Sequence, residues 1–136
     1  MTGVQTCALP IYINTVFTGQ DLAAANWLTR MAKDDYHIYA DVHGVLAFPG
    51  YWGDTTGFYG TSGNPIIRQL PADAGNISPP CYIYLRACNA DNRVVTFATA
   101  YAARQSIGFA DIPGLSQLTG NGKRIYSNGG AQVLLP

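Results

Sequence analysis

The sequence predicts a single α/β domain, with a small mixed sheet and helices packed on it. Residues 18–32 have helical periodicity, and residues 38–42 follow shortly afterwards as an apolar, β-prone run. A helix joined to a hydrophobic strand by so short a connection is half of an α/β unit. The nine tyrosines, fifteen glycines and eight prolines favour short strands and many turns over a helical bundle. We therefore expect a Rossmann-like or α+β variant of the α/β class.

Residues 1–11 are expected to be foreign to the protein. Their sequence, MTGVQTCALPI, resembles the conceptual translation of a common short-read sequencing adapter, as in chains assembled from metagenomic reads. A segment of that origin carries no information about the fold. We expect residues 12–136 to form one domain with a modest core, and to be a fragment of a larger protein.

The opening helix has both a start signal and an apolar side. Thr18 is a candidate N-cap, and Asp21 stands three residues on, where a carboxylate meets free amides. Its apolar residues recur at a period near 3.6 and are expected to face the core. They are Leu22, Ala25, Leu28 and Ala32, with Trp27 and Met31 beside them.

A mixed sheet is expected from four runs of β-prone residues, the first of which is residues 38–42. We place residues 38–42, 82–87, 94–97 and 124–126 in it, the middle two as an antiparallel hairpin. Residues 89–92, Asn-Ala-Asp-Asn, supply the turn chemistry for that hairpin. Alternation of Tyr82 and Tyr84 with Ile83 and Leu85 predicts one amphipathic and one buried face. Residues 66–70 are a short strand candidate, and Asp111 with Pro113 is a candidate start of a short helix.

Charge content argues against one class of function, whereas the cysteines leave the redox compartment open. Charged residues make up 12% of the chain and sum to zero, which argues against nucleic-acid binding through phosphate neutralisation. Cys81 and Cys88 would lie about 23 Å apart on one strand, too far to pair with each other. We expect two buried free thiols, so the cysteines do not fix the redox compartment.

The sharpest polar pattern comes at the end of the first strand. His37, Tyr39, Asp41 and His43 alternate, so their side chains are expected on one face of the strand. Asp41 and His43 stand at its carboxyl end, where open α/β sheets place their ligands. An Asp-x-His pair suits a general base or two metal ligands. A polar strand end hydrogen-bonded to the following loop is the simpler interpretation.

A second candidate site is the glycine-rich segment that contains Trp52 and Asp54. A flat aromatic face beside a carboxylate is typical of loops that contact carbohydrate, although glycine turns packed by their own aromatics share that composition. The chain has no G-x-G-x-x-G, Walker A or C-x-x-C motif and no nucleophile elbow. We expect no catalytic residue, cofactor or metal here, with Asp41, His43, Trp52 and Asp54 as binding candidates.

Four short segments, in this order, resemble the soluble C-terminal domain of prokaryotic polytopic membrane proteins related to lipid-linked-sugar glycosyltransferases (GT-C-like). They are residues 18–28, 38–41, 82–86 and 124–131, the last reading Arg-Ile-Tyr-Ser-Asn-Gly-Gly-Ala. The chain departs from that pattern at Ser127, where Asp is expected, and at Leu134, where an aromatic residue is expected.

The resemblance implies a non-catalytic extracytoplasmic cap domain. The membrane helices, and the catalytic acid of such proteins, would lie in a part of the polypeptide that precedes this fragment. The expected partners are that membrane-embedded part and a glycan or lipid-linked sugar, at the extracytoplasmic face of the cell membrane. Asp41 is then a candidate for ligand or interface contact.

Two other classes of function remain open. One is a carbohydrate-binding or cell-surface module that presents Trp52 and its neighbours. The other is a small standalone enzyme that uses Asp41 and His43, which would need a pocket and a third polar partner.

Overall fold

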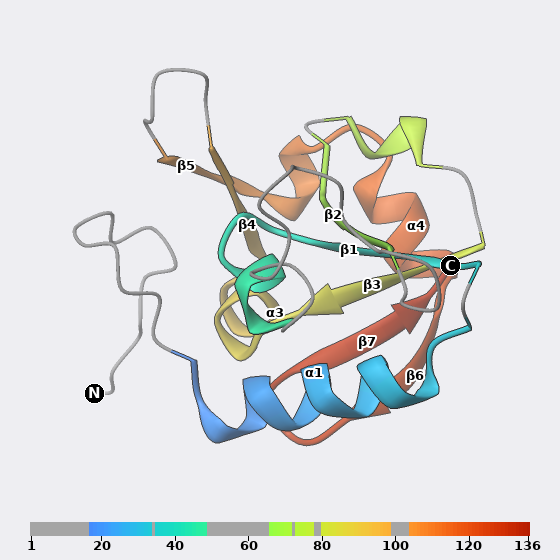
Figure 1. Cartoon of the computed structure of the whole chain (residues 1–136). Helices are drawn as coiled ribbons and strands as arrows, with labels where there is room; N and C mark the ends of the chain where they lie inside the picture. The colour runs from blue at the N-terminus through green and yellow to red at the C-terminus, as the bar shows by residue number, and fades with distance from the viewer. Residues whose placement is uncertain (1–16, 34, 49–65, 72, 78–79, 99–103) are drawn as a thin grey trace.

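A computed structural model describes residues 17–33, 35–48, 66–71, 73–77, 80–98 and 104–136 (Figure 1). It has a five-stranded mixed sheet with helices on both faces and a separate two-stranded antiparallel sheet beside it. The predicted α/β class is confirmed. The order in the main sheet is β2-β1-β3-β7-β6, with β1 at His37–Ala40, β2 at Ile66–Gln69, β3 at Cys81–Leu85, β6 at Lys123–Ser127 and β7 at Gln132–Leu135.

The sheet is parallel on one side and antiparallel on the other. β1 lies between β2 and β3 and runs parallel to both, with Ile38 opposite Ile67 and Tyr82. β7 is antiparallel to β3 and to β6, and it closes the other half of the sheet. Three of the four expected strands therefore belong to this sheet, and the first ends at Ala40 because residues 41–43 turn away from it.

Helix α1, Gly19–Met31, covers one face of the sheet. The predicted N-cap is confirmed, since Thr18 and Asp21 form a reciprocal capping box. The buried stripe of the helix is Asp21, Ala24, Ala25 and Leu28. The prediction that Leu22 and Met31 face the core is wrong: both lie outside this stripe and are exposed, by 44% and 60%.

The other face is covered by short elements from the middle and the end of the chain. They are the 3-10 turns η2, Ala74–Asn76, and η3, Phe109–Asp111, and helix α4, Leu115–Asn121. The helix starts after Gly114 instead of at Asp111, because Gly114 has a φ of 80° and turns the chain there. A side chain at this position would also meet Gly75 at 2.5 Å, so glycine lets η2 and α4 approach closely.

The expected hairpin between residues 82–87 and 94–97 is not formed. Residues Ala87–Asn92 form helix α3 instead, and β4, Val94–Ala98, pairs with β5, Arg104–Gly108, in the two-stranded sheet. Two free amides at the start of α3 find side-chain acceptors, Arg86 N–H at Asn89 Oδ1 and Ala87 N–H at Asp21 Oδ1. Asn89 thus starts a helix, although its residue type also suits a turn.

Strand β3 is buried on both faces, so the predicted amphipathic face is wrong. Tyr82 and Tyr84 pack with α1 in one core cluster, whereas Cys81, Ile83 and Leu85 pack in the other. Central strands covered on both sides are apolar throughout.

The two cysteines differ, and only one matches the expectation of free thiols. Cys81 is a free, buried thiol, and its burial raises its pKa to about 11. Cys88 takes part in a disulfide.

Candidate functional site

The candidate site lies where the direction of strand order reverses. From β1 the chain continues to β2 on one side, and then crosses to β3 on the other side of β1. Asp41 directly follows β1 and Arg86 directly follows β3, so both stand at the carboxyl ends of neighbouring parallel strands. Ligands of open α/β sheets bind in the crevice at such a reversal. The position of Asp41 therefore agrees with that of a binding residue.

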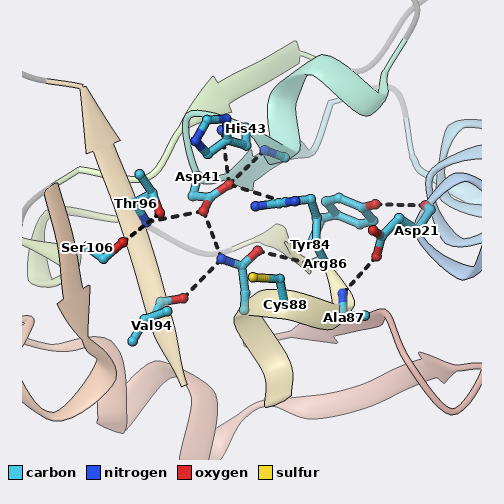
Figure 2. A network of polar contacts seen from close by, with 12 residues as sticks. Asp21, Asp41, His43, Tyr84, Arg86, Ala87, Cys88, Val94, Thr96 and Ser106 are labelled. Atoms are coloured by element: carbon cyan, nitrogen blue, oxygen red, sulfur yellow. Dashed lines mark hydrogen bonds and ion pairs between the residues drawn. The ribbon is translucent and has the colours of Figure 1, made fainter. Parts of the chain in front are cut away.

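The carboxylate of Asp41 is the hub of a buried polar network (Figure 2). Its Oδ1 accepts hydrogen bonds from the main-chain N–H groups of His43 (3.1 Å) and Gly44 (2.7 Å). Its Oδ2 accepts from the side-chain amide of Asn89 (2.8 Å) and the main-chain N–H of Thr96 (3.1 Å). These four donors come from the turn after β1, from α3 and from β4. The carboxylate thus joins three elements that are distant in the sequence.

Arg86 supplies the opposite charge, in an incomplete pairing. Its side chain is 5% exposed, and its Nε lies 3.9 Å from Asp41 Oδ1. This Nε is buried and has no hydrogen-bond partner among the described residues, and the guanidinium carbon lies 5.9 Å from the ring centre of Phe17. Arg86 therefore pairs with an aspartate of the fold. The pair neutralises charge, but the strong hydrogen bonds around Asp41 come from uncharged donors.

Asn89 completes the network and was not predicted as part of a site. Its Oδ1 accepts from Arg86 N–H, and its Nδ2 donates both to Asp41 and to the carbonyl of Val94 at 3.0 Å. The side chain is 1% exposed. One amide thereby holds the start of α3, the end of β1 and the start of β4 together.

A second buried carboxylate, Asp21, connects α1 to the same region. Its Oδ2 accepts from Thr18 N–H at 3.0 Å and its Oδ1 from Ala87 N–H at 2.7 Å. The main-chain carbonyl of Asp21 accepts from the hydroxyl of Tyr84 at 2.7 Å. Burial, and next the nearby Asp21 carboxylate, raise the pKa of Tyr84, so its hydroxyl stays protonated and donates. The spacing of Thr18 and Asp21 in the sequence identified this cap on α1 but not its contact with α3.

The predicted row of four alternating side chains on one strand is not formed. His37 and Tyr39 lie on β1 with their ring centres 6.1 Å apart. Burial lowers the pKa of His37, and the positive charge of Arg68 lowers it further. Asp41 and His43 lie in the following turn, and the contact between them uses the main-chain amide of His43. Trp52 and Asp54 lie outside the described residues.

This geometry limits what Asp41 can do chemically. An ionised carboxylate offers about four lone-pair sites, and Asp41 accepts four N–H donors. A general base or a metal ligand needs a lone pair directed at its proton or its ion. Among the residues that the structure describes, no group of three or more His, Cys, Asp or Glu side chains is placed to hold a metal. The described contacts therefore make Asp41 a structural centre of the fold.

Comparison with known protein families gives a match over nearly the whole chain. The model of a family described as "Predicted membrane protein (DUF2206)" matches residues 6–134. Neither a curated protein nor a solved structure matches the chain. Within the described parts of the chain, no helix has both the length and the apolar character needed to cross a bilayer.

Proposed function

Because the chain belongs to this family of predicted membrane proteins, we propose that it is a non-catalytic cap domain of a glycosyltransferase-like membrane protein. The domain packs at the extracytoplasmic face on a membrane-embedded part of the same polypeptide. It assists that part in binding a glycan or a lipid-linked sugar.

The observation that carries the proposal is that the four segments resembling such domains contact one another. In the first and last segments, Gln20 Nε2 donates to the carbonyl of Asn128 at 3.1 Å, and Asn128 Nδ2 donates to the carbonyl of Gln20 at 2.9 Å. The first and third segments are joined by the Tyr84 hydroxyl at the carbonyl of Asp21, and the second and third by the pair of Asp41 and Arg86. Scattered short matches thus coincide with one structural unit.

The hydrogen bonding of Asp41 supports the non-catalytic part of the proposal. A catalytic carboxylate must exchange a proton with substrate or water during turnover. Asp41 is 2% exposed, and its oxygens are held by four N–H groups of the fold itself. Releasing one of these donors would leave a buried polar group without a partner, which costs about 1–3 kcal/mol.

The first test is the genomic DNA upstream of the codon for Tyr12. We expect an open reading frame continuous with this chain that encodes several apolar runs of about 20 residues. A native gene that begins with this domain, or whose upstream part encodes no such run, contradicts the proposal.

The second test places the domain relative to the membrane in cells that express the complete gene. Ser127→Cys introduces an exposed thiol in β6, and a membrane-impermeant maleimide is expected to label it in intact cells. Cys81 is buried, so the unsubstituted protein serves as the control for background labelling. Labelling that requires cell lysis would place the domain in the cytoplasm and refute the extracytoplasmic assignment.

A further inference from the structure

A groove of about 360 Å³ opens on the α4 side of the sheet, and its lining does not include Asp41, Arg86 or Asn89. Its floor includes the buried side chains of Leu85, Phe109 and Leu134. Small-molecule sites have volumes of about 300–1,000 Å³, so the groove has the size of a site for a small ligand group.

Two arginines from different elements line this groove. Arg93 follows α3 and Arg124 belongs to β6, and both are exposed. No carboxylate lines the groove, and neither arginine has an ion-pair partner among the described residues. The guanidinium of Arg93 lies 5.0 Å from the ring centre of Phe109, which holds its charge over the floor. Two positive charges therefore face one space that has no carboxylate side chain in its lining.

Helix α4 adds hydroxyl groups to the same wall. Ser116 and Thr119 line the groove. The hydroxyl of Thr119 donates its proton to the carbonyl of Leu115 at 2.9 Å, so Ser116 is the hydroxyl that can donate to an anion. The carboxyl end of α4 also lies here, at Gly120 and Gly122. A helix end carries only about half a negative charge, so the two guanidinium groups dominate the local field.

From this arrangement we infer that the groove between α3, α4 and β6 binds the phosphate group of a phosphate ester through Arg93 and Arg124. A phosphate dianion has several acceptor oxygens in a tetrahedron, so guanidinium groups from two sides and a serine hydroxyl can donate to it together. A carboxylate carries only one negative charge and therefore neutralises two guanidinium groups less completely than a phosphate dianion does. This inference goes beyond the proposed cap function and does not depend on it.

The test is a titration of the full ¹⁵N-labelled chain with inorganic phosphate, followed by NMR. We expect saturable shifts of the amide signals of Gly120, Gly122 and Arg124 that sodium chloride at equal ionic strength does not produce. The double variant Arg93→Gln/Arg124→Gln is expected to bind about tenfold more weakly or worse, since charge-assisted hydrogen bonds are lost. Each single variant should show a smaller loss in the same direction.

Arg68→Gln is the matched control, because Arg68 is an exposed strand arginine outside the groove lining. It should keep the affinity of the unsubstituted chain. Shifts no larger than those with chloride, or equal affinity of the double variant, would overturn the inference.

Vesicle co-sedimentation distinguishes two sources of the phosphate group. Vesicles of phosphatidylcholine mixed with phosphatidylglycerol are compared with vesicles of phosphatidylcholine alone. Binding to the anionic vesicles that the double variant loses and Arg68→Gln keeps identifies a lipid headgroup as the source. Binding of inorganic phosphate without vesicle binding identifies a soluble phosphate ester.

Discussion

The Asp41 network and the Arg93–Arg124 groove are both polar, but they treat charge in opposite ways. At the network, a carboxylate is surrounded by four N–H donors and a guanidinium, all supplied by the fold. At the groove, two guanidinium groups are exposed and have no carboxylate beside them in the lining. In the network, groups of the protein satisfy the buried carboxylate. In the groove, two positive charges are exposed and have no carboxylate beside them in the lining.

This difference separates residues that support the fold from residues available to a ligand. A buried polar group must find partners within the protein, because an unsatisfied one is costly. An exposed arginine remains hydrated, so its lack of a partner costs little and leaves it free to bind an anion. A conspicuous Asp at the carboxyl end of a strand is therefore not by itself evidence of an active site.

The largest effect is expected for Asp41→Ala. The substitution removes the acceptor of four hydrogen bonds and leaves the charge of Arg86 buried without its partner. Breaking a buried pair in this way costs about 3–5 kcal/mol, so urea denaturation should show a much less stable or unfolded chain. Asp35→Ala removes an exposed carboxylate and is the control, with an expected change below about 0.5 kcal/mol. If Asp41→Ala lowers the unfolding free energy no more than Asp35→Ala does, Asp41 has no structural role.

Asn89→Ala should have the next largest effect on the unfolding free energy. It removes one accepted and two donated hydrogen bonds from the junction of β1, α3 and β4. We expect a loss of about 2–3 kcal/mol, because the groups left behind are buried. Asn26→Ala on the exposed side of α1 is the matched control and should be neutral or slightly stabilising. If both variants unfold at the same urea concentration, Asn89 does not connect these elements.

Alkaline pH should weaken the buried sheet while leaving the groove charged. The pKa of the Cys81 thiol is raised from 9.0 to about 11, so the folded state keeps a proton that the unfolded state releases. The associated stability is complete below pH 9 and is lost as the pH rises through about 11, on the order of 2 kcal/mol. Urea denaturation of the unsubstituted chain and of Cys81→Ala across this range measures it. A slope that is identical in the two proteins would show that Cys81 does not contribute.

The smallest effect on folding is expected for Arg124→Gln. This side chain is exposed and has no ion-pair partner among the described residues, so the change in unfolding free energy should stay below about 0.5 kcal/mol. Urea denaturation of this variant alongside Asp41→Ala compares the two regions directly. A loss above about 1 kcal/mol would mean that the groove, like the network, supports the fold.

Local signals in the sequence identified the parts of the fold that depend on neighbours in the chain. The capping box of Thr18 and Asp21 and the helix that follows it needed only short-range contacts. The exposure of Leu22 and Met31 could not be predicted, because several apolar residues on α1 compete for one narrow contact stripe. The orientation of the helix on the sheet determines which of these residues are buried.

Contacts between distant parts of the chain determine the structure of the elements that were predicted incorrectly. Residues 89–92 have the composition of a turn, but Asn89 and Asp21 cap the first amides of α3 and make a helix there. The same limit applies to the site. Position in the sequence identified Asp41, but two of its donors lie 48 and 55 residues away in the chain.

Native-state hydrogen exchange of three amides tests the central claim about Asp41 most directly. The N–H groups of His43, Gly44 and Thr96 all donate to its carboxylate. If the network is a structural centre, these amides exchange only when the whole domain unfolds, with the free energy of global unfolding. Fast exchange at all three, at the rate of an open loop, would show that the donors release Asp41 in the native state and would contradict its structural role.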